Sequence, residues 1–96
     1  MSKLDGLQVA LRMANNAVAA EEKDVRTALR EIAREAQYAL QKLAEGREVH
    51  ASELWSLARV ATTGAVAVER ARAARETRAL FADAMTTLAS EESTHE

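Results

Sequence analysis

Apolar residues recur along the first half of the chain at alternating spacings of three and four. This spacing places them on one helix face, because an α-helix completes a turn in about 3.6 residues. After residue 24 the pattern resumes, shifted by one position. The two sets are Leu4, Leu7, Leu11, Ala14 and Val18, followed by Val25, Leu29, Ile32, Ala36, Leu40 and Leu43.

The shift falls near residues 20–24, and it has two physical explanations. A stutter within one continuous helix changes the supercoil locally. A break instead lets Asp24 or a neighbour cap a new helix. Neither Gly nor Pro occurs there, so the sequence favours one helical segment over about residues 3–45.

Residues that favour helix ends mark both sides of the connection. Ser2 and Asp5 have the spacing of a capping box, with Asp in place of the usual Glu. Gly46 is the natural residue just past the first helix, because glycine adopts the left-handed conformation at little cost. Ser52 is the best N-cap for the second helix, with Glu53 in its first turn.

The second segment, over about residues 53–90, has small side chains on most of its faces. We expect Ala61, Gly64 and Val68 to pack against a neighbouring helix, since Gly64 otherwise weakens the helix by about 1 kcal/mol relative to alanine. Arg75 and Arg78 interrupt the apolar face. That face comprises Leu54, Leu57, Ala61, Gly64, Val68 and Ala71, and then Phe81, Met85 and Leu88.

These segments predict an all-α protein, a long antiparallel helical hairpin forming a single domain over residues 1–90. Residues 91–96 are expected to form a frayed polar tail. Because a two-helix hairpin buries only one stripe per helix, we expect hairpins to assemble into a four-helix bundle as a homo-oligomer, with a dimer favoured. In the alternative, both segments break and one chain forms its own short bundle.

Composition narrows the class of protein. The 96 residues include no cysteine and no proline, and alanine leads the 48% hydrophobic content. The absence of cysteine excludes disulfides and thiolate metal sites. A net charge of −2 argues against nucleic acid as a partner. No apolar run reaches the roughly 18–20 residues of a membrane span, and the start lacks the order of a signal peptide. We therefore expect a soluble, cytoplasmic protein with no membrane partner.

An arginine cluster on the second segment is the strongest chemical signal. Arginine offers planar, bidentate donors to phosphate or carboxylate groups. The cluster has three interpretations: a site for a small anionic, nucleotide-like ligand, a docking surface for acidic groups of a partner or sister chain, and an ordinary charged surface. Its members are Arg70, Arg72, Arg75 and Arg78.

Metal and catalytic sites find little support in the chain. Glu31 and Glu35 lie one turn apart, but neighbouring arginines indicate a salt-bridged outer face. The only Glu-x-x-His unit ends at His95, in the expected tail. Ser52, His50 and Glu53 lie too close together in sequence to form a catalytic triad. We expect no enzyme activity, no metal and no cofactor.

Three large side chains are candidate anchors for a partner. Trp55 is expected to close the hairpin end over Leu40, Leu43 or Val49; an exposed Trp55 would instead be a binding hot spot. Phe81 and Met85, one turn apart, are expected in the core, or as an anchor if the bundle is open at that end. The favoured function is a non-enzymatic protein–protein interaction module: a small adaptor, regulator or inhibitor of a larger machine. The alternative is a receptor or sponge for a small anionic ligand.

Overall fold

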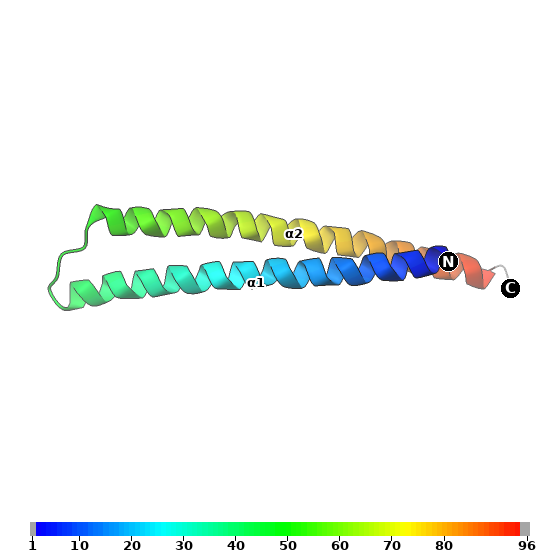
Figure 1. Ribbon diagram of the computed structural model, residues 1–96, viewed down its shortest axis with the longest axis horizontal. Coiled ribbons are helices and arrows are strands. Elements are labelled where there is room, and N and C mark those ends of the chain that lie inside the picture. The colour runs from blue at the N-terminus through cyan, green and yellow to red at the C-terminus, as the bar shows by residue number, and fades with distance from the viewer. Residues whose placement is uncertain (1, 95–96) are drawn as a thin grey trace.

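Two long helices lie side by side in opposite directions, as Figure 1 shows. The computed structural model describes residues 2–94, with side chains described through residue 91. Helix α1 spans Lys3–Ala44 and α2 spans Ala51–Thr94. The molecule measures 76 × 19 × 17 Å, with the connection at one end and both termini near the other. The prediction of an all-α helical hairpin is confirmed.

Helix α1 is continuous through residues 19–24. The residues that face α2 keep one seven-residue repeat along its whole length, so the expected shift in the contact face does not occur. Each residue of this repeat is buried or half-buried. They are Leu7, Leu11, Ala14, Val18, Glu21, Val25, Ala28, Ile32, Glu35, Ala39 and Lys42.

Helix α2 contributes an equally regular strip to the contact. We call the line along which the two strips meet the seam. Its α2 residues are Glu53, Leu57, Val60, Gly64, Ala67, Ala71, Ala74, Arg78, Phe81, Met85 and Leu88. A strict repeat of seven is the pattern of a coiled coil, in which slight supercoiling keeps one strip of each helix toward its neighbour.

Small residues dominate the centre of the seam. The buried apolar residues are Ala14, Val18, Ala28, Ala67 and Ala71, and Gly64 is also buried. A Cβ built on Gly64 would lie 3.2 Å from the Cβ of Ala28 and 3.9 Å from the Cδ1 of Ile32. The helix axes are therefore closely spaced at this level.

Helix α1 is capped at both ends by the residues that the sequence indicates. The Ser2 hydroxyl accepts a hydrogen bond from the Asp5 N–H at 3.2 Å, and the Ser2 N–H donates to the Asp5 carboxylate at 3.4 Å. At the other end Gly46 has φ +70. Its N–H donates to the Leu43 carbonyl at 3.1 Å, and the Arg47 N–H donates to the Lys42 carbonyl at 2.8 Å. This pair of bonds is a Schellman motif.

Helix α2 differs from expectation at both ends. It begins at Ala51, so Ser52 lies inside the first turn and is not the N-cap. The reason is that the His50 carbonyl already accepts a hydrogen bond from the Glu53 N–H, at 3.0 Å. The helix continues to Thr94, beyond the expected end near residue 90, and His95 lies outside the described residues.

Candidate interaction surfaces

The four arginines of the cluster do not converge on one point. At about 100° per residue they spread over roughly 200° of the α2 circumference. The Arg72 guanidinium pairs with Glu69 at 2.7 Å, and both side chains are about two-thirds exposed. The Nε of Arg75 donates to the Ala71 carbonyl at 3.3 Å. This spread prevents the four guanidinium groups from contacting one small anion together.

Arg78 and Arg70 have different surroundings. Arg78 is half-buried in the seam, where it replaces an apolar residue. Arg70 is exposed and lines a polar groove between the helices, opposite Asp24 and Glu31. Two arginines were expected to interrupt the apolar spacing of the second segment. Arg78 lies in the seam, and Arg75 lies beside it.

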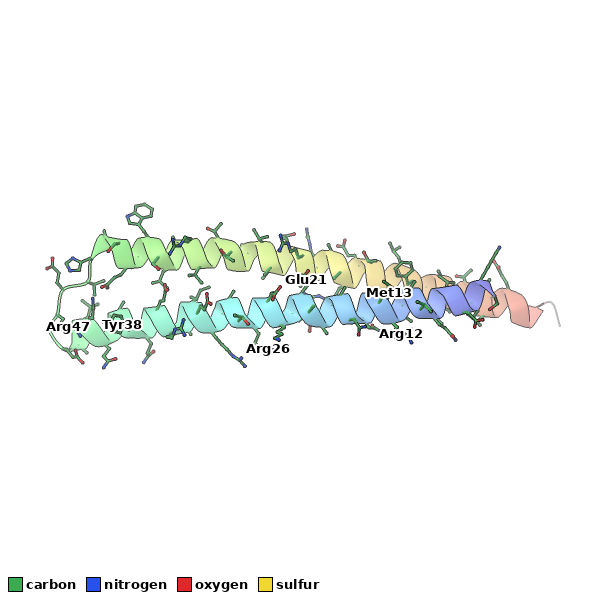
Figure 2. All side chains as sticks on the ribbon, in the orientation of Figure 1. Arg12, Met13, Glu21, Arg26, Tyr38 and Arg47 are labelled. Carbon is green, nitrogen blue, oxygen red and sulfur yellow. The ribbon has the colours of Figure 1, made fainter. Side chains whose placement is uncertain are left out.

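A carboxylate also lies in the seam near its middle. Glu21 is half-buried, and its Oε2 atom has no hydrogen-bond partner among the described residues. Figure 2 shows Glu21 on the side of α1 toward α2, whereas Arg12 and Arg26 project from the opposite side. Such a group weakens the contact between the helices, since an unsatisfied buried acceptor costs about 1–3 kcal/mol.

At the closed end of the hairpin, polar contacts join the two helices. Lys42 and Glu53 form an ion pair whose side chains are 12% and 24% exposed. The Ser56 hydroxyl donates to the Glu35 carboxylate at 3.2 Å. The Lys42 ammonium also lies 5.2 Å from the centre of the Tyr38 ring, within cation–π range. These contacts fix the register of the helices beside the connection.

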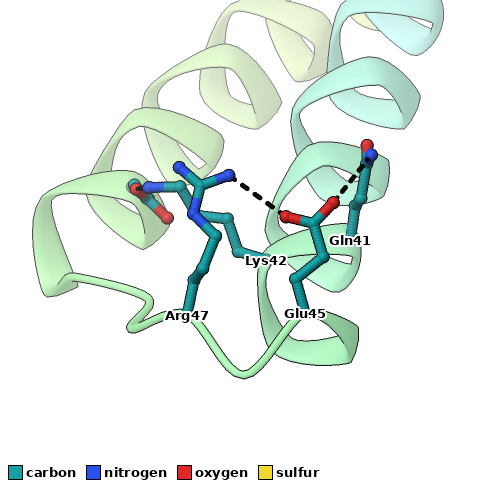
Figure 3. A network of polar contacts seen from close by, with 5 residues as sticks. Gln41, Lys42, Glu45 and Arg47 are labelled. Carbon is teal, nitrogen blue, oxygen red and sulfur yellow. Dashed lines mark hydrogen bonds and ion pairs between the residues drawn. The ribbon is translucent and has the colours of Figure 1, made fainter.

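A second network lies on the connection itself, as Figure 3 shows. Arg47 donates to the Glu45 carboxylate at 3.3 Å, and Gln41 donates to the other carboxylate oxygen at 3.2 Å. The hydrogen bond to Glu45, followed by the interaction with Tyr38, raises the pKa of Arg47 above its ordinary value.

Trp55 does not close the hairpin end. Its side chain is 74% exposed, and it points away from the seam because it lies two residues from both Glu53 and Leu57, which face α1. Tyr38 is 53% exposed. Phe81 and Met85, by contrast, are half-buried in the seam near the open end. Of the three candidate anchors, Trp55 alone is presented outward.

Ala61 and Val68 lie beside the seam, whereas Gly64 lies in it. Ala61 and Val68 are exposed, and they line one side of an apolar groove of about 210 Å³ along the hairpin. Leu29 and Ile32 line the groove from α1. The groove therefore shows that the exposed Leu29 and Val68 belong to the same side of the hairpin.

Seven-residue spacing extends this side in both helices. We define the apolar face as the residues one step beyond the seam on this side: Leu29, Ala36 and Leu43 on α1, and Leu54, Ala61 and Val68 on α2. Leu40, which lies next to the apolar face on α1, extends this face away from the seam. Leu29, Leu40, Leu43 and Leu54 are 59–62% exposed, and Val68 is 46% exposed. The sequence pattern placed these residues in the core; the hairpin leaves them at its surface.

The opposite side of the hairpin is polar. Its groove at mid-length, of about 480 Å³, is lined by Asp24, Thr27, Ala28, Glu31, Thr62, Thr63, Val66, Ala67 and Arg70. The hairpin is therefore two-sided in its closed half, with apolar side chains beyond the seam on one side and polar ones on the other.

Residues considered for metal binding or catalysis remain apart. Glu35 is engaged by Ser56, whereas Glu31 lines the polar groove. Glu53 is paired with Lys42, so it does not support His50 as a triad member would. Within the described residues, no group of three His, Cys, Asp or Glu side chains is arranged to hold a metal ion. No described helix is long and apolar enough to cross a membrane.

Comparisons with protein-family models, with curated proteins and with solved structures gave no match.

Proposed function

We propose that the protein is a non-enzymatic protein–protein interaction module, acting as a small adaptor, regulator or inhibitor of a larger machine and assembling with itself. One observation carries the proposal. Of the described residues, eleven large hydrophobic side chains are exposed, while the intramolecular seam is centred on alanine and glycine. They are Val9, Met13, Leu29, Tyr38, Leu40, Leu43, Leu54, Trp55, Val66, Val68 and Leu80.

Helix α2 gives further support. Large apolar residues of α2 are not confined to the side that faces α1: Leu54 belongs to the apolar face, and Trp55, Val66 and Leu80 lie elsewhere on its surface. An ordinary surface helix keeps its apolar residues in one stripe toward the core. The hairpin covers only one strip of α2, so partners are expected to cover the apolar side chains outside it.

Trp55 is the side chain best suited to a separate protein partner. Tryptophan is strongly enriched among residues that dominate binding energy. Trp55 lies outside the apolar face, so self-assembly through that face leaves it exposed. The alternative function, a receptor for a small anionic ligand, has weaker support, because the arginines diverge around α2 and Arg72 is already paired.

Tryptophan fluorescence of the purified protein tests the availability of Trp55, which is the only tryptophan in the chain. We expect red-shifted emission and full quenching by acrylamide at concentrations where the protein is assembled. Blue-shifted, protected emission would place Trp55 inside the assembly and remove it as a partner anchor.

Photo-crosslinking in cells that produce the protein tests partner binding. A photoreactive residue at Arg59, one turn from Trp55, is expected to yield an adduct with one protein other than the chain itself. The adduct should disappear in Trp55→Ala and persist in Thr62→Ala, an exposed control two turns from Trp55. Adducts with copies of the chain alone, unchanged by Trp55→Ala, would refute the hetero-partner part of the proposal.

A further inference from the structure

We infer that the occupant of the apolar face is a second copy of this chain, docked with both connections at the same end, so that α1 of each copy packs on α2 of the other. The inference deepens the proposed interaction function by assigning a partner to one face. It is tested independently of the role of Trp55, because Trp55 lies outside that face.

The exposed area of the hairpin is the first argument for a second copy. Its accessible surface is 7264 Å², whereas a compact monomer of 10.5 kDa exposes about 5,400 Å². Two copies together exceed twice the compact value by about 3,700 Å². Obligate homodimer interfaces bury about 2,000–5,000 Å². The excess is therefore the amount that one such interface removes.

The sequence pattern is the second argument. A two-stranded coiled coil needs apolar residues at two positions of every seven, whereas helices of a bundle need a third beside them. Leu29, Ala36 and Leu43 supply that third position on α1, and Leu54, Ala61 and Val68 supply it on α2. The extra residues are all on one side, so one further pair of helices covers them.

Charge distinguishes two symmetric ways of stacking the apolar faces. The third position continues toward the open end as Glu22, seven residues before Leu29, and as Arg75, seven residues after Val68. With both connections at the same end, Glu22 of each copy lies level with Arg75 of the second copy. Two carboxylates and two guanidiniums then alternate around the bundle at one level.

The opposite stacking does not pair these charges with each other. With the connections at opposite ends, α1 packs on α1 of the second copy. When the apolar faces are in register, Leu29 then packs on Leu43 of the second copy, and Glu22 and Arg75 lie level with its connection, because α1 ends at Ala44. Only the same-end arrangement places Glu22 of each copy beside Arg75 of the other. The same-end arrangement is therefore favoured.

Sedimentation equilibrium tests the face. The wild-type chain is expected to form dimers. Leu29→Ser is expected to raise the dimer dissociation constant at least about a hundredfold, because it removes two leucine side chains, one from each copy, that the dimer buries. Leu80→Ser is the matched control, since Leu80 is 69% exposed and lies off the apolar face. A wild-type monomer up to millimolar concentration, or equal effects of the two variants, would overturn the inference.

The concentration dependence of the wild-type melting temperature provides a second test, which does not require Leu29→Ser to fold. If a second copy occupies the face, the melting temperature of the wild-type chain rises with protein concentration, because association stabilises the folded state. A melting temperature independent of concentration refutes the inference even where the variant is unfolded.

Mixing two charge variants tests the contact between copies. Glu22→Arg and Arg75→Glu are each expected to weaken self-association. An equimolar mixture should restore self-association. In the mixed dimer, positions 22 and 75 are both basic in one copy and both acidic in the other. Each contact between the copies then joins opposite charges, although the two positions within one hairpin carry like charges. No restoration on mixing would contradict the pairing of Glu22 with Arg75 of the second copy.

Distances between spin labels test the orientation. Because the chain has no cysteine, Arg12→Cys and Glu48→Cys each provide one label site per copy. With both connections at the same end, each label lies within about 30 Å of its counterpart. At 1.5 Å rise per residue, opposite ends would make at least one of the two distances about 50 Å or more. That result would refute the orientation.

Discussion

Replacing Gly64 tests how closely α1 and α2 approach. Its absent side chain leaves room for the Ala28 methyl group, which a Cβ at position 64 would meet at 3.2 Å. Because the Cβ of Ala28 is attached directly to the backbone, only movement of the helices relieves that contact. Gly64→Leu is therefore expected to destabilise the protein by about 1–3 kcal/mol, the usual range for an overfilled core.

Gly64→Ala separates two opposing effects. Alanine improves intrinsic helix stability by about 1 kcal/mol relative to glycine, while the 3.2 Å contact forces the helices apart by a few tenths of an ångström. We expect little net change in stability. In the double variant Ala28→Gly and Gly64→Ala, one methyl group moves from α1 to α2. The change in unfolding free energy caused by Gly64→Ala is expected to be more favourable when Ala28 is already glycine than in the wild type. A double-mutant cycle measures this difference.

Thermal unfolding followed by circular dichroism provides the assay, at one fixed protein concentration because association shifts the midpoint. Each kcal/mol corresponds to about 4–8 °C for a domain of this size. Gly6→Leu is the control, since nothing lies within 4 Å of a Cβ built there. If Gly64→Leu raises the melting temperature, or matches Gly6→Leu, the close-packing argument fails.

Three further substitutions probe the seam and the connection. Glu53→Ala strands the Lys42 ammonium, and since this pair is mostly covered we expect a loss of about 1–3 kcal/mol, against less than about 1 kcal/mol for Glu69→Ala in the exposed pair; equal losses in urea unfolding would contradict this. Arg78→Leu completes the apolar seam and should raise the melting temperature; a decrease would show that the guanidinium is favourably placed. Gly46→Ala forces a left-handed conformation on a residue with a Cβ and should cost about 1–2 kcal/mol in the same assay; no measurable loss would mean that the connection rearranges.

The sequence predicted the helices well because their signals are local. The Ser2–Asp5 capping box and Gly46 act through bonds to residues a few positions away, and spacing of three and four reports a helix wherever it occurs. The two-helix hairpin followed because one connection separates two long periodic segments. The start of α2 was misplaced, because the His50 carbonyl, a backbone group with no sequence signature, replaces the Ser52 cap.

The choice of seam was not predictable from apolar spacing alone. The chain carries two overlapping apolar strips, and spacing of three and four favours the one with larger residues, including Leu29 and Leu43. The hairpin instead brings together the strip in which Ala28 meets Gly64, although that strip also contains Glu21 and Lys42. Close approach of two backbones depends on matching small residues across helices, which is a property of pairs. For the same reason the exposure of Trp55 could not be read from its position in one helix.

The single seam also dictates an order of assembly for the chain. Contacts beside the connection join residues close in sequence: Lys42 and Glu53 are eleven apart, and Glu35 and Ser56 are 21 apart. Each further contact toward the termini closes only a small additional loop once its predecessor has formed, so little extra entropy is lost at each step. Folding is expected to proceed like a zipper from the Gly46 turn. Amide hydrogen exchange should accordingly be slowest around Glu35 and Ser56, close to the turn, and fastest toward the termini, where the last contacts to close are the first to open.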